Sequence, residues 1–148
     1  MKTRLLFGLF IAVFGLGSTV AAQEIDQMES ALKQAQEENK GVALYVYSDS
    51  LNTPSSLSDV FGGEDDWVVQ AYLEKHFVPI YINADSAEGQ ELDQQYNAIG
   101  WYPTLFILDQ EGDRKAFMMI DGKETEPGDF AHFFLMNEIG PGWTASDK

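Results

Sequence analysis

The stretch Tyr102-Pro103-Thr104-Leu105-Phe106-Ile107-Leu108-Asp109 decides the fold of this chain. Its apolar part, Thr104 to Leu108, is short and continuous, which predicts a strand covered on both faces. The next segment, Asp109-Gln110-Glu111-Gly112-Asp113, is rich in turn-forming residues, and a second strand-like run follows over 114–120. Two such runs joined by a short turn containing glycine predict an antiparallel hairpin.

The rest of the chain alternates helical and strand patterns, which is typical of an α/β fold. Met28, Leu32 and Ala35 recur at helical spacing, and Gly41 is suited to a left-handed cap after that helix. Pro79 falls inside a strand-like run, which favours an edge strand. The patterns predict helices over 26–38, 64–75, 87–97 and 127–138, one or two helical turns around 57–61, and strands over 42–47 and 77–82.

The order of these elements resembles the thioredoxin-like superfamily. The resemblance is carried by Trp101-Tyr102-Pro103-Thr104 after a helix, by Phe77-Val78-Pro79, and by a lead-in over 31–50 similar to that of exported members. It covers nearly all of residues 25–140. It implies an α/β, thioredoxin-like fold (β-α-β-α-β-β-α, a mixed central sheet with helices on both faces) with an added N-terminal helix, and a cis Pro103 that faces the family's redox site.

The family's usual chemistry needs a Cys-x-x-Cys motif after the strand at 42–47, where a helix N-terminus lowers the thiol pKa. The chain contains no cysteine. The corresponding motif is Asn52–Ser55 if Pro54 matches the motif's proline, or Ser50–Thr53 if the following helix sets the alignment. The resemblance also implies a buried acid near 44–46, where the sequence is Leu-Tyr-Val. Thiol–disulfide exchange is therefore excluded for this chain alone.

A binding role needs no sulfur, because main-chain hydrogen bonds can hold an extended peptide beside Pro103. We therefore expect a protein or peptide partner of unknown identity, with a chaperone-like or assembly role. The alternative for Pro103 is that it only shapes the fold, and Thr53-Pro54 also fits an N-cap followed by the first helical residue. The candidate binding residues are Trp101, Tyr102, Pro103, Thr104, Leu51, Asn52, Thr53, Pro54 and Ser55.

Two other functions remain open from the sequence. One is a thiol-independent enzyme that uses Ser50 or Ser55, which would need a base such as His76 or His132. The other is a purely structural subunit of an envelope complex. The acids lack the spacing of a calcium loop, and two distant histidines without cysteine do not suggest zinc, so we expect neither a metal nor a cofactor.

The N-terminus has the pattern of a secretory signal. Lys2 and Arg4 precede an apolar run over 5–16, and small residues lead to Ala22, which predicts a signal peptide over 1–22 and a domain over 23–148. The remaining chain would carry seven Lys and Arg against 24 Asp and Glu, a formal net charge of −17. Such a charge repels nucleic acid and anionic lipid, so we expect neither nucleic acid nor a membrane as a partner after cleavage. The signal pattern itself predicts a periplasmic or secreted protein.

Overall fold

The computed structural model describes residues 27–61, 66–97, 100–121 and 124–139. The signal peptide predicted over 1–22 lies outside these ranges. Each predicted helix and strand is present, and the ends that fall on described residues agree to within two residues. The predicted helix starts at 26 and 64 lie outside the described residues. The elements are α1 (Gln27–Glu38), β1 (Gly41–Tyr47), α2 (Leu57–Phe61), α3 (Asp66–His76), β2 (Phe77–Asn83), α4 (Ala87–Tyr96), β3 (Thr104–Leu108), β4 (Arg114–Met119) and α5 (Pro127–Met136).

Two details of the predicted helix ends are wrong. The left-handed residue after α1 is Asn39, with φ of 53°, whereas Gly41 is the first residue of β1. Asparagine tolerates this conformation better than most side chains, so the turn does not need the glycine. Thr53-Pro54 does not cap α2 either, because that helix begins at Leu57.

The four strands form one mixed sheet in the order β2-β1-β3-β4. β1 and β2 are parallel, from Gly41 opposite Phe77 to Tyr47 opposite Asn83. β3 is antiparallel to both β1 and β4. β2, which contains Pro79, is an edge strand, as the sequence predicts, and β4 is the other edge strand of the described sheet.

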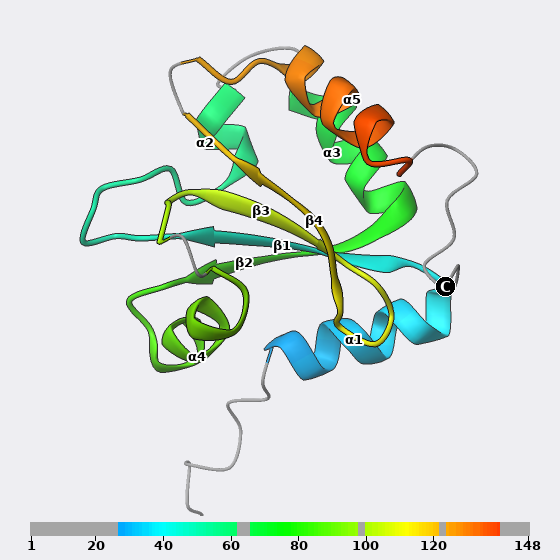
Figure 1. The fold of residues 1–148 in the computed structure, drawn as a ribbon, viewed down its shortest axis with the longest axis horizontal. Coiled ribbons are helices and arrows are strands. Elements are labelled where there is room, and N and C mark those ends of the chain that lie inside the picture. Colours follow the sequence, from blue (N-terminus) through cyan, green and yellow to red (C-terminus); the bar gives the residue numbers. More distant parts are fainter. Residues whose placement is uncertain (1–26, 62–65, 98–99, 122–123, 140–148) are drawn as a thin grey trace, which may run out of the picture.

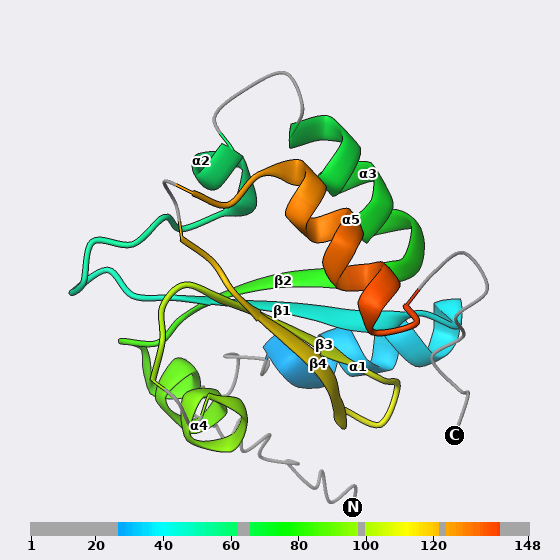
Figure 2. The same ribbon diagram turned by 45° about the horizontal axis from the view of Figure 1, so that its top comes forward.

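Helices cover both faces of the sheet (Figures 1 and 2): α1 and α4 lie on one face, and α2, α3 and α5 lie on the other. Because side chains alternate along a strand, β1 supplies Val42, Leu44 and Val46 to the first core and Ala43 and Tyr45 to the second. All five residues of β3 are buried, which explains its unbroken apolar sequence.

The topology brings several loops to one end of the sheet, which we name the loop end. β1, β2 and β4 stop there and β3 starts there, since Val46 and Met119 both pair with Thr104. The segments 48–56, 84–86, 100–103 and 120–121 are therefore neighbours. Within the described ranges, no helix is long and apolar enough to cross a bilayer.

Candidate functional site

A hollow of about 360 Å³ opens at the loop end. Six of the nine sequence-predicted binding residues line it, from two segments about fifty residues apart. We name it the Pro103 hollow. Its lining residues are Asn52, Thr53, Pro54, Trp101, Tyr102, Pro103, Ile120 and Asp121.

The other three predicted residues do not line this hollow. Leu51 has 63% of its surface exposed and lies outside the lining. The Ser55 hydroxyl donates to Asp59, and Thr104 is fully buried with its hydroxyl donated to the Trp101 carbonyl at 2.7 Å. Thr104 therefore holds the Gly100–Pro103 loop in position through its hydrogen bond to the Trp101 carbonyl.

The Tyr102–Pro103 peptide bond at the centre of the hollow is cis. The Pro103 carbonyl accepts a hydrogen bond from the Ile120 amide at 3.0 Å, which ties the loop to the end of β4. The main-chain N–H and C=O of Tyr102, by contrast, have no hydrogen-bond partner among the described residues. The backbone N–H and C=O of this one residue, beside the hollow, are thus available to pair with another chain.

The Tyr102 side chain is anchored away from this free main chain. Its hydroxyl donates to the Asp93 carboxylate on α4 at 2.7 Å. Burial and the hydrogen bond to Asp93 raise the pKa of Tyr102 to about 12, so the phenol stays protonated as a donor at neutral pH. The hydrogen bond to Asp93 thus holds Tyr102 in place while its backbone N–H and C=O stay available.

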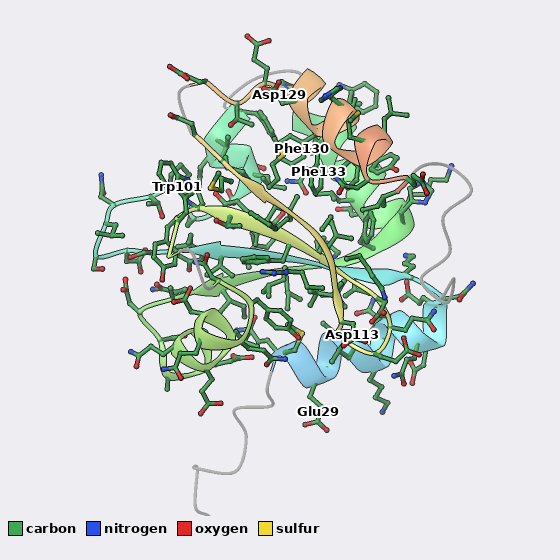
Figure 3. The ribbon with its side chains drawn as sticks, in the orientation of Figure 1. Glu29, Trp101, Asp113, Asp129, Phe130 and Phe133 are labelled. Carbon is green, nitrogen blue, oxygen red and sulfur yellow. The ribbon has the colours of Figure 1, made fainter. Side chains whose placement is uncertain are left out.

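Trp101 combines a fixed backbone with an exposed side chain. Its carbonyl accepts from the side-chain amide of Asn97 at 3.1 Å and from the Thr104 hydroxyl, and it follows Gly100, whose φ of 62° favours glycine. The indole N–H donates to the Ile120 carbonyl only at 3.5 Å, and 48% of the residue is exposed. Figure 3 shows Trp101 at the loop end, where its ring is available for an apolar contact.

The loop in place of the redox motif is closed by its own hydrogen bonds. The Thr53 hydroxyl accepts from the Ser48 amide at 2.8 Å and donates to the Ser48 carbonyl, which in turn accepts from the Thr53 amide. Asn52 has a φ of 53°, which allows the tight turn. Ser56 caps the N-terminus of α2, because its hydroxyl accepts a hydrogen bond from the Asp59 backbone amide.

Tyr45 anchors this loop from the core. The resemblance implies an acid near this position, and the structure has a phenol there, 1% exposed, that donates to the Pro54 carbonyl at 2.9 Å. Burial raises the pKa of Tyr45, so the hydroxyl remains a donor. The aromatic body belongs to the core formed with α2, α3 and α5.

Asp85 holds the same loop from the side, and the sequence reasoning missed it. Its carboxylate accepts from the Ser50 amide at 2.7 Å, from the Ser50 hydroxyl at 2.9 Å and more weakly from Ser48. These hydrogen bonds, first that from the Ser50 amide, hold the pKa of Asp85 below its usual range. Because β1 and β2 are parallel neighbours, an acid just after β2 was a detectable signal for a contact with the loop after β1.

The geometry does not supply an activated serine. His76 precedes the start of β2, about 20 Å along the sheet from the loop end by strand length. His132 lies on α5, in a different hollow. Asp85 is a poor base because its pKa is lowered. Among the described residues, no group of three or more His, Asp or Glu could hold a metal ion.

A scan against protein-family models and a search of curated protein sequences find no match. Solved structures do match. A disulphide isomerase from Xylella fastidiosa Temecula1 is 17% identical with a TM-score of 0.59, covering 83% of this chain and 97% of its own. A thioredoxin from Thermus thermophilus is 22% identical with a TM-score of 0.56, covering 73% and 82%.

A third similar structure is the C-terminal domain of Neisseria meningitidis DsbD in the oxidised form, at 22% identity and a TM-score of 0.53, covering 75% of this chain and 92% of that domain. At these identities the similarity concerns the fold alone. The fold predicted from the sequence is confirmed by this agreement and by the mixed sheet between two helical layers. This chain therefore has a thioredoxin-like fold, and it carries no cysteine.

Proposed function

We propose that this chain is an exported thioredoxin-like protein without redox chemistry, which binds an extended segment of another protein or peptide in the Pro103 hollow. The observation that carries the proposal is the free main-chain N–H and C=O of Tyr102 beside the exposed ring of Trp101. The proposed role is chaperone-like or in assembly, in which binding itself is the activity.

The physical basis is strand addition. An extended peptide that pairs with the Tyr102 backbone gains main-chain hydrogen bonds that do not depend on its sequence, and its side chains then select between sites. Trp101 adds a large aromatic contact of the kind that dominates binding energies. Hydrogen bonds with Asn97, Thr104 and Ile120 already fix the Pro103 loop, so this loop loses little conformational entropy when a peptide binds.

Export is supported by the N-terminal sequence, in which basic residues, a short apolar run and Ala21-Ala22 follow one another. The lack of cysteine supports a role without electron transfer, since the chain offers no thiol for disulfide exchange.

A panel of short synthetic peptides tests the proposal, with binding to residues 23–148 followed by fluorescence anisotropy. For a peptide that binds, Trp101→Ala should weaken affinity about tenfold or more, because it removes the main side-chain contact. Trp67→Ala is the matched control, since Trp67 is 69% exposed but lies on α3 and does not line the hollow. Equal affinities for wild type and Trp101→Ala would contradict the proposal.

A second version of each peptide, N-methylated at successive backbone amides, tests the main-chain contact. Methylation at one position should remove binding, because the methyl group blocks the hydrogen bond to the Tyr102 carbonyl. If every methylated peptide bound as well as its parent, recognition would not run through the backbone.

A further inference from the structure

A second hollow continues from the Pro103 hollow along β4. It has a volume of about 520 Å³ and lies between β4 and α5, so we name it the β4–α5 hollow. Asp121 lines both hollows. Its neighbours in the chain divide between them, since Ile120 lines the Pro103 hollow and Met119 lines the β4–α5 hollow. A peptide bound beside Tyr102 can therefore pass from one hollow to the other without leaving the surface.

The β4–α5 hollow mixes apolar and acidic side chains. Met136 of α5 is 69% exposed, and Met118 of β4 and Phe133 of α5 are half-buried; Met118 is the β4 methionine on the face that α5 covers. Methionine adapts its shape to different apolar partners. The acids are Asp121, Glu124 and Asp129, all exposed. Figure 3 labels Asp129 and Phe133 on α5.

The described cations lie elsewhere. No Lys or Arg of the described residues lines either hollow. Lys40 pairs with Glu38 at 2.7 Å and Lys115 pairs with Asp109 at 2.7 Å, both at the end of the sheet opposite the loop end. The remaining described cations are Lys33 on α1, Lys75 in the last turn of α3 and Arg114 at the start of β4.

The described part of the neighbouring segment, residues 121 and 124–129, contains four acids and no Lys or Arg; Lys123 lies outside the described residues. The Asp129 carboxylate accepts from the Glu126 amide at 2.7 Å, which fixes its position. A partner that enters this hollow therefore meets a negative surface, and a basic partner is favoured by charge complementarity.

We propose that the β4–α5 hollow takes the next part of the same extended peptide, and that this part carries Lys or Arg together with an apolar side chain. The basic groups lie against Asp121, Glu124 and Asp129, and the apolar side chain packs on Met118 and Met136. This inference rests on the proposed function, because the peptide is first held at Tyr102. It narrows the partner to extended segments in which basic and apolar residues are adjacent.

The test uses a peptide that binds in the Pro103 hollow, extended by a tail with Lys residues or by the same tail with Gln in their place. The Lys-tailed peptide should bind wild type about tenfold more tightly at low salt, and the difference should shrink at high salt because the acids are exposed. Glu124→Gln should weaken the Lys-tailed peptide about two- to fivefold and leave the Gln-tailed peptide unchanged.

Two controls match these variants. Glu91→Gln removes the same charge from an exposed position on α4, on the other face of the sheet, and should leave both affinities unchanged. Met136→Ser should weaken a peptide with an apolar tail about threefold, whereas Leu135→Ser should not. Leu135 is 70% exposed and adjacent in sequence, but it lines a separate groove between α3 and α5.

The outcomes separate this inference from the proposed function. If Trp101→Ala weakens both peptides but the Lys and Gln tails bind alike, the Pro103 hollow binds peptide and the inference about the second hollow is wrong. If Glu91→Gln acts like Glu124→Gln, only the overall charge matters, and the inference is again wrong. If wild type binds none of the peptides, both the proposed function and the inference fail.

Discussion

Two loops meet at the Pro103 hollow, and they use their polar groups in opposite ways. The loop from Ser48 to Pro54 directs its hydroxyl and backbone groups inward, to one another, to Asp85 and to Tyr45. The loop from Gly100 to Pro103 fixes its outer carbonyls but leaves the Tyr102 N–H and C=O without a partner among the described residues. The polar groups of the first loop are satisfied within the protein, whereas the second loop leaves the backbone N–H and C=O of Tyr102 available.

This difference supports the proposed function, in which binding needs no thiol. The loop after β1 is a turn whose polar groups bond to one another and to Asp85, and the described residues give it no activated nucleophile. Under the proposed function, the loop beside it holds a peptide through its main chain, which needs no reactive atom. The comparison predicts that changes in the first loop alter stability, whereas changes that disturb the second loop alter peptide affinity.

The largest expected effect comes from the anchor of the closed loop. Tyr45→Ala should lower the free energy of unfolding by about 3–5 kcal/mol, because it leaves a cavity in the core beside Tyr81, whose ring centroid is 5.5 Å away. Tyr45→Phe should cost about 1 kcal/mol, since it removes only the hydrogen bond to Pro54. Urea unfolding measures both. Equal losses for the two variants would show that the hydroxyl, not the ring, dominates.

A pair of Thr→Val variants distinguishes the contributions of the two loops to stability and to peptide affinity. Thr53→Val and Thr104→Val should each cost about 1–2 kcal/mol of unfolding free energy, because each removes a hydroxyl that bonds to the backbone. Only Thr104→Val should also weaken peptide binding, since it loosens Trp101, whereas the Thr53 hydroxyl is occupied inside its own loop. If Thr53→Val weakened binding as much as Thr104→Val, the closed loop would itself take part in recognition.

The smallest expected effect is that of Asp85→Asn on how the free energy of unfolding changes with pH. The pKa of Asp85 is lower when folded than when unfolded, so its contribution is present above the ordinary Asp pKa of about 4 and is lost as the pH falls through the lower folded value. Asp85→Asn should therefore make the loss of stability between neutral and acidic pH shallower. Urea midpoints at neutral pH and below pH of about 3.5 measure it.

Hydrogen exchange gives the local control for Asp85→Asn. The Ser50 amide should exchange faster in this variant, because it loses a charged acceptor. Asp59→Asn, which removes another carboxylate whose pKa is lowered by serine hydroxyls, should leave the Ser50 amide unchanged. Unchanged exchange at Ser50 in Asp85→Asn would show that the carboxylate does not hold this loop.

The elements of the fold could be predicted because their patterns are unambiguous. β3 is buried along its whole length and has a continuous apolar sequence, and α1 repeats its buried residues at Met28, Ala31 and Ala35. The cap at Asn39 could not be predicted with the same certainty, since Asn39 and Gly41 both tolerate positive φ and only the start of β1 decides between them.

The site was predictable only in part. Trp101, Tyr102 and Pro103 follow from the local sequence, whereas Ile120 and Asp121 reach the hollow through the pairing of β3 with β4, which includes a bulge at Leu108. A shift of register by one residue would point different side chains at the hollow. Thr104, which the sequence also suggested for binding, lies at the start of β3 with its side chain buried, where it donates to the Trp101 carbonyl and does not line the hollow.

The most direct test of the central claim is a peptide titration followed at the Tyr102 amide by NMR in ¹⁵N-labelled residues 23–148. A peptide that binds should shift this amide signal in a saturable way and slow its hydrogen exchange, and the N-methylated peptide should do neither. A bound peptide that leaves the Tyr102 amide unshifted and equally exchangeable would contradict the account.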